Sequence, residues 1–304
     1  MPDPVRDQSL LPCLVVLNPA AGRGRANKIR EGLRRRLESA KVSHDWCETT
    51  APGHASELAL RATRNTHSRI LLVGGDGTVA DLAPALVDRP EAPPLALIPG
   101  GTGNDIAKTL GLSGLTLDQQ LSIALEGREK SLDAGRVNGL IFINGFGAGL
   151  DGAVAARSRQ VPFITGIATY LAAFAMTLPG WKPFRYSADL DGEKLEGEAT
   201  LVTFANGRIC GGGFLLTPRA DPADGLVDGC IVGAHGRLAI LYHLPKAIAG
   251  HHVREPGTIY RQVRRIGIEF DRPLAGHIDG NLMPGIRRAD IEVLPGAIRA
   301  MTAG

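Results

Sequence analysis

In the first part of the chain, short apolar runs alternate with stretches in which apolar residues recur every four positions. Residues 12–17 (PCLVVL) form the first run, which stops at an Asn-Pro turn signal, as a buried strand does. Over Ala26–Ala40, the apolar residues Ile29, Leu33 and Leu37 recur between Arg and Lys residues. This spacing predicts an amphipathic helix after the strand.

The alternation continues as far as residue 132. Further strands are predicted over residues 42–47 and in the runs RILLVG and PLALIP; helices are predicted over Gly53–Thr63, over Val79–Val87, where Pro84 limits the length, and from Asp105. Strands that alternate with helices pair in parallel through right-handed crossovers. We therefore predict an α/β domain with a parallel sheet over residues 1–134.

After Leu132 the pattern changes to strand-like runs separated by Gly, Pro and Asp. These runs are LIFIN, ATLVTFAN, GLVDGCIV, RIGIEF and DIEVLP. They predict a β-rich, mostly antiparallel domain over residues 135–294. Whether the last segment, 295–304, returns to complete the first domain is left open.

One segment of the second domain, Val161–Gly180, carries no charged side chain and by length alone could span a bilayer. Pro162 and Pro179 leave only sixteen residues between them, and Gly166 interrupts those. Because Pro and Gly weaken a helix interior, we expect a helix that packs on the β domain or touches a membrane rather than crossing it.

The formal net charge is +3, and its distribution says more than its size. From Arg23 to Arg36 there are seven basic residues and one acid, Glu31. This run could meet phosphate or an anionic membrane surface; the plain alternative is a solvated helix face. No finger, basic zipper or aromatic-studded basic motif accompanies the charge, so nucleic acid is not an expected partner. The four cysteines include no CxxC pair, as expected of a cytoplasmic protein.

Three glycine-rich turns follow predicted strands of the first domain: Asn18–Gly24 (NPAAGRG), Gly74–Thr78 (GGDGT) and Gly100–Asp105 (GGTGND). In an open parallel sheet, ligands bind outside the carboxyl ends of the strands, and glycines let backbone N–H groups approach phosphate oxygens. Three such turns favour a nucleotide site over ordinary turns. No GxxxxGK[ST] motif occurs, so this is not a P-loop protein.

The side chains within these turns suit the same chemistry. Asp76 could bind Mg²⁺ or polarise an attacking hydroxyl, although a helix cap is the alternative. Thr78, Thr102 and Asn104 offer neutral hydrogen bonds to phosphate, and Arg23 could neutralise its charge.

A fourth glycine motif, GAGLDG over Gly147–Gly152, matches the dinucleotide fingerprint GxGxxG. That fingerprint requires an acid about twenty residues later. No acid follows before Asp189, so a dinucleotide oxidoreductase is a weak alternative.

Taken together, the motifs resemble the bacterial diacylglycerol-kinase and related lipid-kinase family. The resemblance runs through LNPAAGRG, ETTAPGHA, VGGDGT, IPGGTGNDIAKTLGL, SLDAGRVNG, FINGFGAGLDG, NGRICGGGFLLTPRADPADGLVD and HIDGNLMPG. GGDGT alone is shared with NAD kinases and phosphofructokinases. GGDGT followed by PGGTGND and then by GGGFLLTP is far more specific.

The resemblance implies two domains with ATP in the cleft between them. The implied nucleotide-binding residues are Asn18, Gly22, Arg23, Thr49, Gly74, Gly75, Asp76, Gly77, Thr78, Asp81, Gly101, Thr102, Gly103 and Asn104. It also implies a structural Mg²⁺ site, with carboxylate oxygens from Asp221 and Asp224, the backbone carbonyl of Leu226, and Asp133 tied to the metal network. An Asp-Pro and Asp-Gly turn that binds no metal is the alternative reading of ADPADGL.

The chain departs from the family where the pattern usually ends in DGE, whose glutamate is the implied proton acceptor. Here the sequence is Asp279-Gly280-Asn281, and an amide cannot accept a proton near neutral pH. Asp76 or Asp279 could serve as the base instead, with His277 as a weaker candidate. Phosphoryl transfer could also proceed without a base, since it depends mostly on positioning and charge stabilisation.

We therefore predict an ATP- and Mg²⁺-dependent lipid kinase acting on a hydroxyl of diacylglycerol, a sphingoid base, ceramide or a similar lipid. Association with the inner membrane face is expected to be peripheral. An isologous homodimer is expected on base rates alone. Two alternatives remain open: an inactive nucleotide- or lipid-binding homologue, motivated by Asn281, and an NAD kinase-like enzyme, motivated by GGDGT.

Overall fold

The computed structural model describes residues 11–161, 164 and 166–303, so that positions 162, 163 and 165 of the apolar stretch lie outside the described residues. The chain divides into two compact units. One runs to Leu132 and takes in the C-terminal stretch from Gly296, and the other comprises Asp133–Pro295. The division thus lies two residues before the boundary predicted at residue 134, and the last segment belongs to the first unit.

The first unit is built on a parallel sheet. Its strands β1 (Cys13–Leu17), β2 (His44–Glu48), β3 (Arg69–Gly74) and β4 (Leu95–Pro99) lie in the order β4-β3-β1-β2. Every pair among them is parallel. The end of the long strand β13 (Asn281–Thr302) adds a further parallel partner, with Ala300 opposite Leu95. This pairing explains why the C-terminal residues belong to the first unit.

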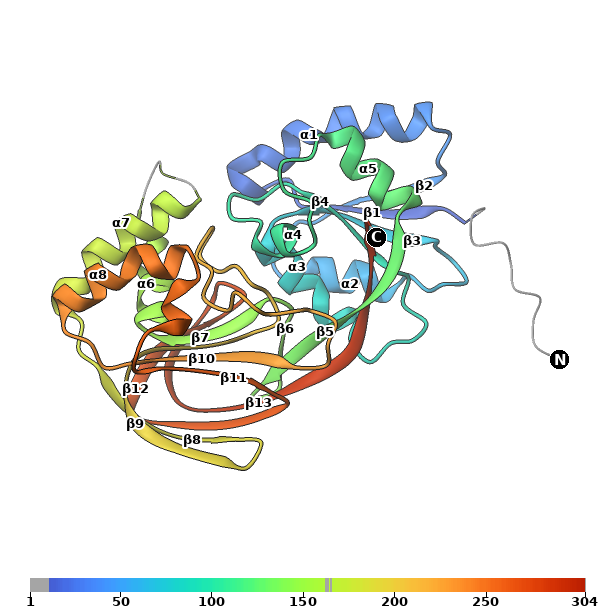
Figure 1. The fold of residues 1–304 in the computed structure, drawn as a ribbon. Helices are drawn as coiled ribbons and strands as arrows, with labels where there is room; N and C mark the ends of the chain where they lie inside the picture. The colour runs from blue at the N-terminus through green and yellow to red at the C-terminus, as the bar shows by residue number, and fades with distance from the viewer. Residues whose placement is uncertain (1–10, 162–163, 165, 304) are drawn as a thin grey trace. The chain divides into compact units, whose positions relative to one another are not determined.

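Helices cover both faces of this sheet (Figure 1). α1 (Ala21–Ser39) and α5 (Leu117–Glu126) lie on one face, where Leu33, Leu37 and Leu121 are buried against the strands. On the other face lie α2 (His54–Leu60) and α3 (Asp76–Leu82), which continues as a 3₁₀ turn, η2 (Ala83–Ala85). The short α4 (Asp105–Thr109) follows the third glycine turn.

Two of the predicted helix bounds were wrong. The α-helix predicted over Val79–Val87 begins at Asp76, inside the glycine turn, and gives way to η2, which contains Pro84. Proline removes the backbone donor that an α-helix needs there. The helix predicted over Gly53–Thr63 ends at Leu60. The prediction over Ala26–Ala40 is confirmed, because the backbone of Gly22–Gly24 is left-handed and the regular part of α1 runs from after Gly24 to Ser39.

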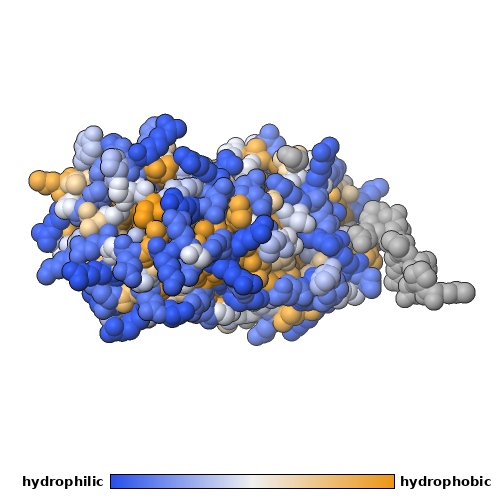
Figure 2. All heavy atoms as spheres, turned by 60° about the horizontal axis from the view of Figure 1, so that its bottom comes forward, coloured by the Kyte–Doolittle hydropathy of each residue, from blue (hydrophilic) through white to orange (hydrophobic). Residues whose placement is uncertain are grey.

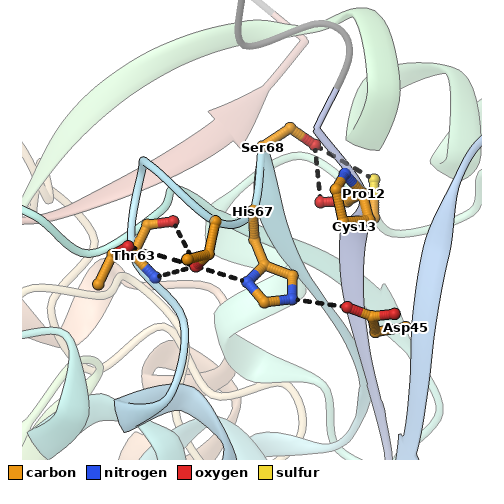
Figure 3. A network of polar contacts seen from close by, with 7 residues as sticks. Pro12, Cys13, Asp45, Thr63, His67 and Ser68 are labelled. Carbon is orange, nitrogen blue, oxygen red and sulfur yellow. Dashed lines mark hydrogen bonds and ion pairs between the residues drawn. The ribbon is translucent and has the colours of Figure 1, made fainter. Parts of the chain in front are cut away.

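At the amino ends of these strands, away from the glycine turns, polar side chains tie neighbouring segments together (Figure 3). His67 Nε2 lies 3.0 Å from Asp45 Oδ2, and Ser68 Oγ lies 3.5 Å from Cys13 Sγ. Burial raises the pKa of the Cys13 thiol. This thiol therefore has a packing role, because the thiolate is the reactive form of cysteine.

The second unit is mostly antiparallel β, as predicted. Its sheet has the order β11-β10-β9-β7-β12-β13, with β8 paired to both β9 and β12, and all these pairs are antiparallel. The strands are β7 (Gly145–Gly149), β8 (Phe184–Leu190), β9 (Glu193–Ala205), β10 (Val227–Gly233), β11 (Thr258–Val263) and β12 (Arg265–Ile278). β5 (Arg128–Val137) leads in from the first unit and pairs with β6 (Leu140–Phe142) and β13. Along β8, buried and exposed residues alternate, which places Phe184, Tyr186 and Ala188 in the core.

Three α-helices pack together on this sheet (Figure 1). They are α6 (Leu150–Ser158), α7 (Ile167–Thr177) and α8 (Arg237–Ile248), and two 3₁₀ turns follow them, η3 (Leu178–Gly180) and η4 (His251–Arg254). Phe174 of α7 and Ile240 of α8 are buried in one apolar cluster with Leu150 and Val154 of α6. The helix predicted near residue 170 is therefore confirmed. Among the described residues, no helix combines the length and the apolarity that crossing a membrane requires.

Candidate functional site

The three glycine turns of the first unit contact one another at the carboxyl ends of β1, β3 and β4. Asn18 Nδ2 donates a hydrogen bond to Thr78 Oγ1 at 2.9 Å, which joins the first turn to the second. The Gly100 N–H donates to the Gly74 carbonyl at 2.7 Å, which joins the third turn to the second. The three glycine turns, which were predicted after three separate strands, therefore form one continuous backbone surface.

Glycine is required where these turns meet. A Cβ atom at Gly101 would lie 2.6 Å from the Gly75 Cα, and one at Gly22 would lie 2.1 Å from the Gly100 carbonyl oxygen. Neither distance is compatible with a side chain, so the turns pack backbone against backbone. Glycine turns of this kind let backbone N–H groups approach an anion.

Asp76 holds the second and third turns together. Its Oδ1 accepts a hydrogen bond from the Ile106 N–H in α4 at 3.0 Å. A Cβ atom at Gly103 would lie 3.0 Å from the other oxygen, Oδ2, so that oxygen lies beside the third turn. This half-buried carboxylate therefore caps a helix, as the alternative to metal binding proposed. The helix that it caps is α4, whereas Asp76 itself begins α3.

Two other predicted nucleotide contacts shape the loops around them. The carboxylate of Asp81 accepts from the N–H groups of Gly53 and Ala55, at 2.6 and 3.2 Å, at the start of α2. Asn104, with a left-handed φ of 52°, accepts from the Gly101 N–H and donates to the Gly101 carbonyl, both at 2.9 Å.

Thr49 and Thr102 differ in their accessibility. Thr49 is buried, and its N–H donates to the Leu17 carbonyl at the end of β1, whereas Thr102 is exposed at the tip of the third turn.

The basic run of α1 is only partly available to a ligand. Arg30 pairs with Glu48 and Arg36 pairs with Asp118, which favours the solvated helix face for these two side chains. Arg23 is exposed at the turn and has a left-handed φ of 58°, an unusual conformation for a residue with a side chain. It lies in the first glycine turn, as the sequence predicted.

In the second unit, the predicted metal-network residues surround one turn. Asp133 Oδ2 accepts from the Gly225 N–H at 2.7 Å, Asp221 accepts from the Ala223 N–H, and Asp224 accepts from the Leu226 N–H. Burial raises the pKa of Asp224, and the charges of Asp221 and Asp133 raise it further.

A bound cation would relieve this repulsion between the carboxylates. Carboxylate and carbonyl oxygens are also the ligands that Mg²⁺ prefers, so the residues present fit this ion. Within the described residues, no three His, Cys, Asp or Glu side chains are grouped closely enough to hold a metal. The predicted site, with two carboxylates and one carbonyl, stays a prediction.

Asp279 anchors the turn that carries Asn281. Its carboxylate is buried and accepts three backbone hydrogen bonds, from Ile143, Asn144 and Gly145, at 2.8 to 2.9 Å. Burial raises the pKa of this carboxyl, while the three N–H groups and His277 act to lower it. Asn281 itself begins β13 and is exposed.

A pair formed by a buried histidine and a partly buried aspartate lies beside this turn. His277 Nε2 is 3.2 Å from Asp151 Oδ2 in α6, and Thr203 Oγ1 donates to the same oxygen at 3.1 Å. A Cβ atom at Gly147 would lie 2.0 Å from Asp151 Oδ2 and 2.6 Å from His277 Nε2, so a larger residue there would displace this pair. The first glycine of GAGLDG thus makes room for the pair, a role that needs no dinucleotide. Sequence reasoning missed Asp151, although its place four residues after a strand glycine was a usable signal.

Next to Asp151 the second unit has an apolar pocket with a cavity volume of about 100 Å³. Its walls come from α6 (Leu150 and Val154), α7 (Tyr170 and Phe174) and α8 (Ile240 and Leu244), as well as from β9 and β10. Among the described residues that line it, Asp151 is the only carboxylate, and His235, His243 and His252 are also present. The pocket therefore offers a mainly apolar cavity with one acidic side chain and three imidazoles in its wall.

Comparison with known families assigns both units. Residues 12–137 match the diacylglycerol kinase catalytic domain, and residues 145–302 match the YegS C-terminal NAD kinase beta sandwich-like domain. The chain belongs to the diacylglycerol-kinase family. The two matched domains together also confirm the two-domain architecture expected from the motifs.

Relatives in this family span nearly the whole chain. A diacylglycerol kinase of Bacillus subtilis (strain 168) is 26% identical over 276 residues, covering 89% of this chain and 91% of the relative. One of Mycobacterium tuberculosis (strain H37Rv) is 28% identical over 290 residues, covering 93% of each. A solved structure from Bacillus anthracis str. Sterne, described provisionally as a diacylglycerol kinase, has a TM-score of 0.78 at 25% identity and covers 96% of this chain and 97% of its own.

Proposed function

We propose that this family member is an ATP-dependent kinase that transfers the γ-phosphate of ATP to the hydroxyl of a long-chain lipid. The observation that carries the lipid half of this proposal is the apolar pocket of the second unit. Its walls come from three helices, and the carboxylate of Asp151 lies among them. An apolar cavity with few polar groups suits an acyl chain better than it suits a nucleotide.

The glycine turns support the nucleotide half of the proposal. Their backbones pack so closely at Gly75, Gly101 and Gly22 that a side chain would not fit, and glycine backbone lets N–H groups approach phosphate oxygens. Thr102 and Arg23 are both exposed in these turns, where a hydroxyl and a positive charge could contact phosphate oxygens. The ATP cleft between the two domains stays a prediction.

In the proposed reaction, the lipid hydroxyl oxygen forms a bond to the γ-phosphorus of ATP while the bond from that phosphorus to the β-phosphate oxygen breaks. ADP leaves, and the hydroxyl proton passes to a base. We assign Asp76 to orient the hydroxyl, because it holds two phosphate-binding turns in place and is only half-buried. Asp279 is assigned to anchoring its turn, since both of its oxygens accept backbone hydrogen bonds.

Mg²⁺ would supply positive charge that the phosphates of ATP require. The residues proposed to hold a structural Mg²⁺ are Asp221 and Asp224 through carboxylate oxygens and Leu226 through its carbonyl, with Asp133 fixing the turn between them. In that arrangement Asp133 positions backbone rather than contacting a substrate.

A second candidate function is an inactive homologue that binds ATP and lipid without turnover. Asn281, which stands where the resemblance places a glutamate, is the observation that favours it. The NAD kinase-like alternative is favoured only by GGDGT and by the beta sandwich-like description of the second unit, which concerns its fold.

Three variants distinguish these functions in one assay of phosphate transfer from Mg·ATP to lipid alcohols in mixed micelles, with NAD as a separate acceptor. For an active lipid kinase, we expect Asp76→Asn to lower kcat by about a hundredfold or more, as loss of a group acting on the reacting hydroxyl does. The exposed Asp271→Asn is the matched control. Product from Asn281→Glu alone would identify the wild type as an inactive homologue, and NADP as the product would support the NAD kinase-like enzyme.

A further inference from the structure

The helix α8 exposes large apolar side chains on its outer face. Leu238 is 84% exposed, Leu241 48% and Tyr242 67%, and their spacing of three and four residues places them on one side of the helix. Among the described residues, seven large hydrophobic side chains are exposed, and five of them belong to α8, to α7 or to the segment just before α7. The exposed apolar surface is thus concentrated on one part of the second unit.

Figure 2 shows one face of the molecule, on which polar residues predominate and hydrophobic residues appear in small groups between them. Three neighbouring exposed apolar side chains on one helix are therefore a candidate interaction site.

The inner face of α8 is apolar as well. Ile240 is buried, and together with Leu244 and Ala247 it lines the apolar pocket. A helix that is apolar on both sides is normally buried on both sides, or lies against a membrane. The inner side of α8 lines the pocket, whereas the side chains of its outer side are exposed.

The charge around this face fits an anionic surface. From Arg237 to Arg254 the chain carries three permanently basic residues and contains no acid, and Arg237 and Arg254 are exposed. The first acid after this stretch, Glu255, is paired with Lys246. The ammonium of Lys246 also lies 4.3 Å from the ring centre of Tyr242, which places a cation and an amphipathic ring side by side. This combination is characteristic of residues at a membrane–water interface.

The other basic segment lacks the apolar part of such a surface. On α1 the apolar residues Leu33 and Leu37 are fully buried against the sheet, and the exposed residues include Arg25, Lys28 and Arg35. Charge alone gives weak, salt-sensitive attraction to a bilayer, and stable peripheral binding takes a second, apolar signal.

We propose that the outer face of α8 is a membrane-docking surface, on which Leu238, Leu241 and Tyr242 enter the headgroup region of an anionic bilayer. The same helix forms the wall of the apolar pocket, so a lipid would move from the bilayer to the pocket along α8. The docking does not depend on turnover. Only the route into the pocket rests on the proposed lipid-kinase function.

The test is co-sedimentation of the full chain with vesicles of phosphatidylcholine alone and with vesicles that also contain phosphatidylglycerol. The wild type should bind the anionic vesicles. The double variant Leu238→Asp/Leu241→Asp should lose roughly tenfold or more of its vesicle affinity, because two inserted apolar side chains become charged. Leu140→Asp is the matched control, since Leu140 lies in the same unit and is 53% exposed. It should bind as the wild type does.

Two further measurements separate this proposal from its competitors. Sedimentation velocity reports whether a second copy of the chain covers α8; a dimer that dissociates in the double variant, with vesicle binding unchanged, would overturn the proposal. Loss of vesicle binding in Lys28→Glu/Arg35→Glu, with binding retained in the α8 variant, would also overturn it and place the contact on α1.

Kinase rates then show whether docking failed or the proposed function failed. The α8 double variant should phosphorylate vesicle lipid at least about tenfold more slowly while keeping its rate on a short-chain, water-soluble lipid alcohol. An equal loss on both substrates would contradict docking. If the wild type phosphorylates neither substrate but binds anionic vesicles through α8, the proposed function fails and the docking surface stands.

Discussion

Replacing Asp279 should destabilise the second unit far more than the loss of one surface carboxylate. The carboxylate is buried, and it accepts hydrogen bonds from the N–H groups of Ile143, Asn144 and Gly145. In Asp279→Ala these three buried donors lose their acceptor. Asp279→Asn keeps one oxygen as an acceptor and replaces the other by an NH₂ group. With the amide oxygen at the Oδ1 position, that NH₂ group would face the Ile143 N–H, which is also a donor.

The magnitude follows from the three contacts. A buried donor left without a partner costs about 1–3 kcal/mol, so three of them set an expected loss of roughly 3–9 kcal/mol for Asp279→Ala. Removing the buried charge of Asp279 offsets part of that loss, so we expect the free energy of unfolding to fall by about 3–4 kcal/mol. The Asn variant should lose about 1–2 kcal/mol, because the oxygen shared by Asn144 and Gly145 is preserved.

The two tryptophans of the chain allow each unit to be followed separately. Trp46 lies in β2 of the first unit, and Trp181 packs on the core of the second. In a Trp46→Phe background, urea unfolding followed by fluorescence reports the second unit through Trp181. The Trp181→Phe background reports the first unit through Trp46 in the same way.

We expect Asp279→Ala to lower the urea midpoint reported by Trp181 and to change the signal of Trp46 much less. Asp271→Ala, which removes an exposed carboxylate from the same unit, serves as the control and should shift the free energy of unfolding by under about 0.5 kcal/mol. A loss below about 1 kcal/mol for Asp279→Ala, or equal losses for the Ala and Asn variants, would refute the anchoring role.

Three more predictions concern the nucleotide site, the pocket and pH. Gly101→Ala should weaken ATP binding about tenfold or more in calorimetry, because its Cβ would displace the backbone of Gly75; unchanged affinity would contradict the close packing. Ala247→Phe, which fills the pocket, should lower kcat/KM for long-chain lipids about tenfold and leave ATP affinity unchanged. Burial lowers the pKa of His252 below its ordinary 6.5, so the unfolded chain binds a proton that the folded unit resists. Stability should therefore be complete above pH 6.5 and fall as the pH drops below it, with a smaller fall in His252→Gln; an identical pH dependence of Tm would refute this assignment.

The glycine turns could be located from the sequence because each one interrupts a strand abruptly, and the parallel sheet brings strand ends to one edge. Their mutual contacts could not be predicted, since Asn18 and Thr78 meet only after the sheet has formed. The same holds for Asp151 and His277, which lie far apart in the chain and become a pair only when β7, β12 and α6 pack together.

The helix α8 was missed for a different reason. Its apolar residues cover both sides and Pro245 lies inside it, so it shows neither an amphipathic period nor an uninterrupted helical run. Near Pro84 the apolar pattern predicted too long a helix instead of none. The pattern continues to Val87, but an α-helix cannot accommodate Pro84, and the backbone forms the 3₁₀ turn η2 there.

The most direct test of the central claim is transfer of labelled γ-phosphate from Mg·ATP to a long-chain lipid alcohol, measured in the organic phase after extraction. The lipid-kinase function predicts labelled lipid with the wild type and at least about a hundredfold less with Asp76→Asn. ATP binding by the wild type without labelled lipid, across diacylglycerol, sphingoid and ceramide acceptors, would contradict it.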